Sequence, residues 1–171
     1  MSDSPTVIFS HGQESGPWGT KIQRLAATAR AGGFDVESID YTDLPHAEDR
    51  VYRLVEHHPI GRPLVLVGSS MGAYVAARAA GQLQPDGLFL LAPAFALPEC
   101  EPVEPPLHAS EAVIVHGWRD SIISPEPVIG WARQWGTELH LVDDEHRLKE
   151  RIDRIDAWFG EFLRRFRSAG P

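Results

Sequence analysis

The sequence has one cysteine, no long apolar run and little positive charge, and each of these shortages excludes a class of protein. Cys100 has no partner for an internal disulfide, and an incidental loop thiol is a simpler interpretation of it than a reactive one. Such sparse cysteine use is typical of a reducing compartment, so we expect a cytoplasmic protein. No run approaches the roughly 18 apolar residues that a membrane helix needs. The N-terminal residues also lack the charged and apolar regions of a secretory signal.

The charge balance is acidic, with 24 Asp and Glu against 16 Lys and Arg and a formal net charge of −8. Because no long basic stretch occurs before the C-terminal end, nucleic acids and anionic membranes are poor candidate partners. The sequence contains no His-Glu-x-x-His motif, no cluster of Cys and His, no phosphate-binding P-loop and no G-x-G-x-x-G after its first apolar run. We therefore expect no metal and no cofactor.

Length and periodicity indicate one α/β domain over residues 1–171. Short apolar runs alternate with segments of helical spacing, which predicts a mostly parallel sheet with helices on both faces. Right-handed crossovers make that sheet doubly wound, with functional groups gathered at the carboxyl ends of its strands. We expect about six strands, at 6–10, 34–41, 63–68, 87–92, 112–116 and 138–142, and helices at 20–30, 47–58, 71–83, 127–135 and 148–166.

The strongest chemical signal is Gly68-Ser69-Ser70-Met71-Gly72, which follows the most apolar run and opens a helix. A G-x-S-x-G sequence between a strand and a helix is the context of a nucleophile elbow, in which a strained turn raises a serine above the sheet. The helix N-terminus there favours developing negative charge. Ser70 is at the motif centre and is the predicted nucleophile. Ser69 competes with it, and a tight turn in some other ligand-binding fold is the alternative.

Two further polar groups follow the last two predicted strands. Asp120 closes the sequence HGWRD, from which its carboxylate could reach a histidine on the next loop. His146 precedes the last helix, and it alone of eight histidines combines that position with the chain order Ser, Asp, His. Such a histidine could accept the serine proton at Nε2 while the aspartate accepts Nδ1–H. The alternatives are a helix cap at Asp120 and a solvated loop position for His146. Asp143 and Asp144 are alternative carboxylates, but their closeness to His146 in the chain suggests loop or capping roles.

The sequence SHGQESGPW, directly after the first predicted strand, can contribute to an oxyanion hole. Acyl transfer needs two donors for the developing negative charge. The backbone amide of Met71, next after the predicted nucleophile, is one candidate, and the amide of Gln13 is the second. Gly12 permits a close backbone approach. An ordinary glycine-rich turn is the alternative interpretation.

With these four motifs in this order, nearly the whole chain resembles the α/β-hydrolase superfamily, and in particular its small esterase-like members without a large lid. The resemblance implies that Ser70 is the nucleophile, Asp120 the acid after the penultimate strand and His146 the histidine after the last strand. It also implies that the amides of Gln13 and Met71 form the oxyanion hole.

The chain departs from larger members of that superfamily in two places. It lacks their first antiparallel hairpin, since the first strand already ends in His-Gly. Where members with a cap domain usually place it, only a proline-rich segment at about 95–110 is available. We therefore expect no large cap domain and an open, shallow site.

The function implied is that of a serine hydrolase of the carboxylesterase type, which cleaves a small-molecule ester or thioester with a small acyl group. The alternatives are a non-catalytic binding or regulatory protein on the same fold, a peptidase and a C–C bond hydrolase. We expect a monomer, because the apolar stripe of the last helix can be buried entirely in the core. The candidates for an apolar acyl pocket are Trp18, Phe95, Ile122 and Ile123.

Overall fold

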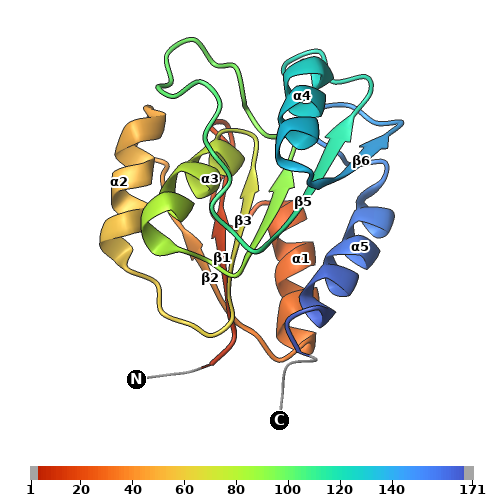
Figure 1. Cartoon of the computed structure of the whole chain (residues 1–171). Coiled ribbons are helices and arrows are strands. Elements are labelled where there is room, and N and C mark those ends of the chain that lie inside the picture. The colour runs from red at the N-terminus through yellow and green to blue at the C-terminus, as the bar shows by residue number, and fades with distance from the viewer. Residues whose placement is uncertain (1–3, 168–171) are drawn as a thin grey trace.

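Six short segments, most of them buried, form one sheet in the computed structural model, which describes residues 4–167 (Figure 1). The strands lie in the order β2-β1-β3-β4-β5-β6, and every neighbouring pair is parallel. The predicted sheet is confirmed. Of the predicted domain over 1–171, residues 1–3 and 168–171 lie outside the described residues. The strands are β1 (Thr6–Ser10), β2 (Asp35–Ile39), β3 (Leu64–Ser69), β4 (Gly87–Leu91), β5 (Glu111–Gly117) and β6 (Glu138–Val142).

Within residues 4–167, five helices cover the two faces of the sheet (Figure 1). Side chains alternate along a strand, so Leu64 and Leu66 of β3 enter one apolar cluster while Val65 and Val67 enter the other. The first cluster packs under α2, α3 and α4, and the second packs under α1 and α5. No helix in this range is long and apolar enough to cross a membrane. The helices are α1 (Thr20–Ala31), α2 (Ala47–His57), α3 (Met71–Leu83), α4 (Pro125–Trp135) and α5 (Ile152–Arg164).

The proline-rich segment between β4 and β5 lies against the domain and forms no cap. Trp131 of α4 donates its indole N–H to the carbonyl of Pro105, at 2.6 Å. Tyr74 of α3 donates its hydroxyl to the carbonyl of Pro102, at 2.9 Å. Both anchors are buried aromatic side chains, whose polar ends need a partner when the rings enter the core. The segment is therefore fixed along α3 and α4, as expected for a member without a lid.

The last helix begins four residues later than its apolar stripe predicts, at Ile152 instead of Leu148. Leu148 has a φ of 54°, which no α-helix accommodates, although its side chain is fully buried. Asp144 accepts the amide N–H of Arg151 at 2.9 Å, just before the first turn of α5. The apolar side chain of Leu148 is thus part of the core, while residues 147–151 form a turn beside the carboxyl ends of the strands.

Candidate active site

Ser70 sits in a strained turn between β3 and α3. Its φ of 56° and ψ of −119° lie in a region that non-glycine residues rarely adopt. The turn is held because the Ser70 amide donates to the carbonyl of Leu91, at 2.9 Å. A side chain at Gly68 would overlap the backbone of α3, and one at Gly72 would overlap the carbonyl of Ser10. The two glycines therefore let strand and helix approach closely enough to expose the serine.

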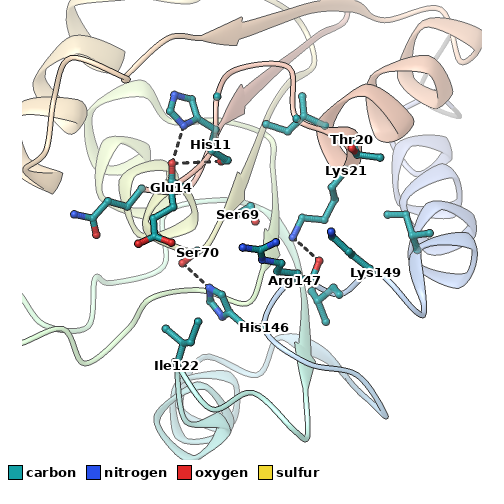
Figure 2. A pocket seen from close by; sticks show the side chains of 18 residues that line it. His11, Glu14, Thr20, Lys21, Ser69, Ser70, Ile122, His146, Arg147 and Lys149 are labelled. Carbon is teal, nitrogen blue, oxygen red and sulfur yellow. Dashed lines mark hydrogen bonds between the residues drawn. The ribbon is translucent and has the colours of Figure 1, made fainter.

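His146 connects Ser70 to Asp120. Its Nε2 lies 3.0 Å from Ser70 Oγ and its Nδ1 lies 2.7 Å from Asp120 Oδ2. Figure 2 shows the imidazole turned toward the serine hydroxyl. Because a carboxylate oxygen only accepts, Nδ1 carries the proton and Nε2 can accept the hydroxyl proton of Ser70. The structure thus brings together the three side chains that the sequence analysis assigned to catalysis.

Asp120 is surrounded by hydrogen-bond donors on a loop after β5. Its Oδ1 accepts the amide N–H groups of Ile122 and Ile123, at 2.9 and 2.8 Å. Its side chain is fully buried, so these donors replace the water that would otherwise solvate the carboxylate. The helix cap considered for Asp120 is supplied by Ser124, whose hydroxyl accepts the amide N–H of Glu126 at the start of α4.

A second histidine, His116, approaches the same carboxylate oxygen as His146. Its Nε2 is 3.3 Å from Asp120 Oδ2 and 2.9 Å from the carbonyl oxygen of Ile123. Burial lowers the pKa of His116, so the ring is neutral and Nε2–H faces these two acceptors. His116 is the first residue of HGWRD and is not among the predicted site residues. Its position four residues before Asp120 is the feature of the sequence that could have indicated a contact with that carboxylate.

The alternative carboxylates Asp143 and Asp144 have structural partners. Asp143 pairs with Arg119, with 2.7 Å between Oδ1 and Nε. Asp144 is buried and accepts the backbone amides of Glu145 and Arg151, at 2.8 and 2.9 Å. Both residues therefore have the loop and capping roles that the sequence analysis favoured for them.

The loop after β1 is fixed by two buried side chains. His11 accepts the amide N–H of Tyr41 at Nε2, 2.9 Å away, and its Nδ1–H donates to the carbonyl of Gly12 at 2.7 Å. Burial lowers the pKa of His11, in agreement with this neutral tautomer. Arg50 of α2 donates to the carbonyls of His11 and Gly12, at 3.2 and 3.3 Å, and to that of Leu44 at 2.7 Å. Arg50 is not among the predicted site residues, because nothing in the local sequence pattern marks it as buried.

This anchoring determines where the amide of Gln13 points. In a trans peptide the N–H points opposite to the preceding C=O, and here the Gly12 carbonyl is held by Arg50 and His11. The loop also runs close to Ser70, because a Cβ built on Gly12 would lie 3.5 Å from Ser70 Cβ. Met71 is the first residue of α3, where amides have no acceptor within the helix. Both predicted oxyanion positions are therefore next to the nucleophile.

A cavity of about 580 Å³ opens beside Ser70 (Figure 2). No group of three or more His, Cys, Asp and Glu within residues 4–167 is placed to hold a metal ion. The cavity is bounded by the loop after β1, the first turn of α1, the turn after His146 and the apolar side chains of Ile122 and Ile152.

The sequence matches the model of the Alpha/beta hydrolase family over residues 7–169. The chain belongs to the Alpha/beta hydrolase family. A search of curated proteins found no match. Among solved structures, the chain is similar to a candidate hydrolase of the alpha/beta superfamily from Xanthomonas campestris pv. campestris. The two share 34% sequence identity over 94% of this chain and 98% of the other, with a TM-score of 0.83.

Two more distant structures share the fold of this hydrolase. One is XC6422 from Xanthomonas campestris, described as an α/β serine hydrolase without a lid. It is 24% identical, with 99% of this chain and 89% of the other covered and a TM-score of 0.72. The other is Est1E from Butyrivibrio proteoclasticus, which is 15% identical, with 97% and 89% covered and a TM-score of 0.76.

The acyl pocket predicted for this hydrolase needs correction, because Ile122 alone of its four predicted residues lines the cavity. Trp18 lies instead with its ring centroid 5.4 Å from the guanidinium of Arg30. Phe95 is buried against Trp131, with 5.0 Å between ring centroids. Ile123 is buried too, and its backbone binds Asp120 and His116. The cavity is also lined by four charged residues that were not predicted, Glu14, Lys21, Arg147 and Lys149.

Proposed function

We propose that this hydrolase cleaves a carboxylic ester, or a thioester, through an acyl-enzyme formed on Ser70. The observation that carries the proposal is the position of His146, which is hydrogen-bonded to Ser70 Oγ and to Asp120 Oδ2 at the same time. A histidine held between a hydroxyl and a carboxylate is the arrangement that activates a serine nucleophile. The similarity to a lidless serine hydrolase supports the same reaction class.

The reaction proceeds in two halves. His146 removes the Ser70 proton as the hydroxyl attacks the substrate carbonyl, and the imidazolium then protonates the leaving alcohol or thiol. The same imidazole activates a water molecule that attacks the acyl-enzyme and releases the acid. Asp120 keeps Nδ1 protonated and stabilises the imidazolium in both halves.

The oxyanion formed at each step is stabilised by the amides of Gln13 and Met71. Each such donor contributes about 3 kcal/mol of transition-state stabilisation in enzymes of this type. The N-terminus of α3 adds a favourable electrostatic term, because its dipole is positive at Met71. The cavity has no cap over it, which favours small acyl groups over long chains that need a covered tunnel.

The proposal is tested with a fluorophosphonate probe and p-nitrophenyl esters of short acids. We expect the probe to label Ser70, as located by peptide mapping, and we expect turnover to fall at least about 1,000-fold in Ser70→Ala. Ser110→Ala is the matched control, since Ser110 is exposed and lies outside the site. Full activity in Ser70→Ala would refute the assignment. An unlabelled protein without turnover would favour a binding protein on this fold, and preferred cleavage of amides would favour a peptidase.

A further inference from the structure

Three cationic side chains line the cavity beside Ser70. Lys21 comes from the first turn of α1, and Arg147 and Lys149 come from the turn after His146. Figure 2 shows their nitrogen ends directed into the same space, beyond Ser70 and His146. The late start of α5 at Ile152 is what leaves Arg147 and Lys149 on a turn beside the cavity. This concentration of positive charge occurs in a chain whose formal net charge is −8.

No described carboxylate forms an ion pair with these three cations. Within residues 4–167, the hydrogen-bond acceptor of Lys21 Nζ is a neutral group, the backbone carbonyl of Arg147, at 3.1 Å. Acidic residues do lie nearby in the sequence, but they pair elsewhere. Asp143, Glu145 and Glu150 all pair with Arg119, at 2.7, 3.7 and 3.1 Å. The protein therefore neutralises the outer side of this turn and leaves its cavity side positive.

The electrostatics of Lys21 agree with this geometry. The pKa of Lys21 is lowered to about 8, chiefly by burial and in smaller part by the neighbouring charges of Arg147 and Lys149. The carboxylates of Asp144 and Asp120 oppose this shift without cancelling it. A negative group in the cavity would supply the missing counter-charge.

We infer that this hydrolase acts on esters that carry a carboxylate, and that Lys21, Arg147 and Lys149 bind the carboxylate. This inference rests on the proposed esterase function and names its substrate class. Glu14, a carboxylate on the opposite side of Ser70 in Figure 2, repels the charged end of such a substrate toward the three cations. The ester carbonyl then lies at Ser70, while the charged end occupies the rest of the cavity. Electrostatic selection of this kind acts on both affinity and association rate.

The experiment compares matched substrates that differ in one charge. In the first pair, methyl hydrogen adipate and methyl adipamate, the carboxylate or the amide that replaces it is on the acid side of the ester. In the second pair, 4-acetoxybenzoate and 4-acetoxybenzamide, it is on the alcohol side. We expect kcat/KM to be at least about tenfold higher for the charged member of one pair, which corresponds to one well-placed ion pair. About 1 M sodium chloride should reduce that preference, since salt screens exposed charges.

The variants are Arg147→Gln and Lys149→Gln, singly and together. Both side chains are exposed, so their replacement leaves the core intact. In the double variant, kcat/KM for the charged ester should fall by at least about tenfold, to that of its uncharged partner, so that the preference is lost. Arg133→Gln is the matched control, because Arg133 is exposed on α4 and lies outside the cavity. Equal kcat/KM values within both pairs, or a preference that survives in the double variant, would overturn the inference and leave the esterase proposal standing.

A second measurement does not depend on turnover. In Ser70→Ala, titration calorimetry compares the binding of methyl hydrogen adipate and 4-acetoxybenzoate with that of their amides. We expect the charged member of one pair to bind at least about tenfold more tightly, and we expect this difference to vanish when Arg147→Gln and Lys149→Gln are added. Equal affinities within both pairs would overturn the inference, whatever the catalytic assays give.

Discussion

Replacing Asp120 by Asn tests the proposed chemistry most directly, because the change alters one atom of a fully buried side chain. Asn can still accept the two backbone amides that bind Oδ1 of Asp120. Its NH₂ group would then occupy the place of Oδ2, where it faces Nδ1 of His146 and Nε2 of His116. A donor at that place requires an unprotonated Nδ1 on His146. The proton then moves to Nε2, which can no longer accept from Ser70.

The size of the effect follows from two contributions. An imidazolium and a carboxylate about 4 Å apart attract each other by about 4 kcal/mol at an effective dielectric constant of about 20, and Asn removes that attraction from the transition state. Restoring the productive tautomer against the new hydrogen bond costs about 1 kcal/mol more. Since 1.36 kcal/mol corresponds to a factor of ten, we expect kcat to fall by about 1,000-fold to 10,000-fold. A serine protease in which the equivalent aspartate was replaced by Asn lost about 10,000-fold, which is of the same order.

The assay is the steady-state hydrolysis of a p-nitrophenyl ester, together with the rate of fluorophosphonate labelling. Asp143→Asn is the matched control, because it makes the same chemical change at an exposed residue that pairs with Arg119 outside the site. We expect that control to stay within about twofold of the parent, as exposed ion pairs contribute little. Circular dichroism verifies that both variants fold. Asp120→Asn with more than about a tenth of the parent activity would refute the assigned role of the carboxylate.

Three further predictions concern the residues that support the site and the stability of the fold. Arg50→Met should lower kcat/KM by about 10-fold to 100-fold, because it releases the loop after β1. The free energy of unfolding in urea should fall by less than about 2 kcal/mol, because the buried guanidinium has no described ion pair to lose. Gly72→Ala should destabilise the fold by more than about 2 kcal/mol, because the new Cβ would overlap β1. Gly130→Ala should stabilise the fold by about 0.5 kcal/mol or more, because there is open space for its Cβ. Similar unfolding midpoints for the two variants would contradict this. The fold lowers the pKa values of His11 and His116 below 6.5. Below about pH 6.5 the unfolded chain therefore binds more protons at these histidines than the folded chain does. The free energy of unfolding should fall as the pH is lowered from 7 to 5.

The local elements of this fold follow closely from residue patterns. Apolar runs bounded by Gly, Pro and polar residues predicted β1, β6 and α3 with the same bounds that the structure has. The start of α5 was the clear error. Leu148 continues the apolar stripe, but its buried side chain belongs to a turn that Asp144 stabilises by accepting an amide from Arg151. Periodicity reports which side chains are buried, and it does not report the backbone conformation that buries them.

The lining of the cavity could not be predicted in the same way. Trp18 and Phe95 are candidates for an apolar acyl pocket, yet Trp18 contacts Arg30 and Phe95 packs against Trp131. Whether an aromatic ring faces a cavity or the core depends on neighbours that are distant in the chain.

The sequence by itself determined the strands and helices, their order, and the turn between β3 and α3 that holds Ser70, because these depend on backbone preferences and side-chain patterns within a few residues. Only the tertiary structure decided that His146, 76 residues beyond Ser70 and 26 beyond Asp120, lies within hydrogen-bond distance of both. It did so because the parallel order β3-β4-β5-β6 brings the carboxyl ends of these strands to one edge of the sheet. The same packing places the side chains of Lys21, Arg147 and Lys149 along one cavity. Contacts of this kind depend on which strands become neighbours, and no local pattern encodes that.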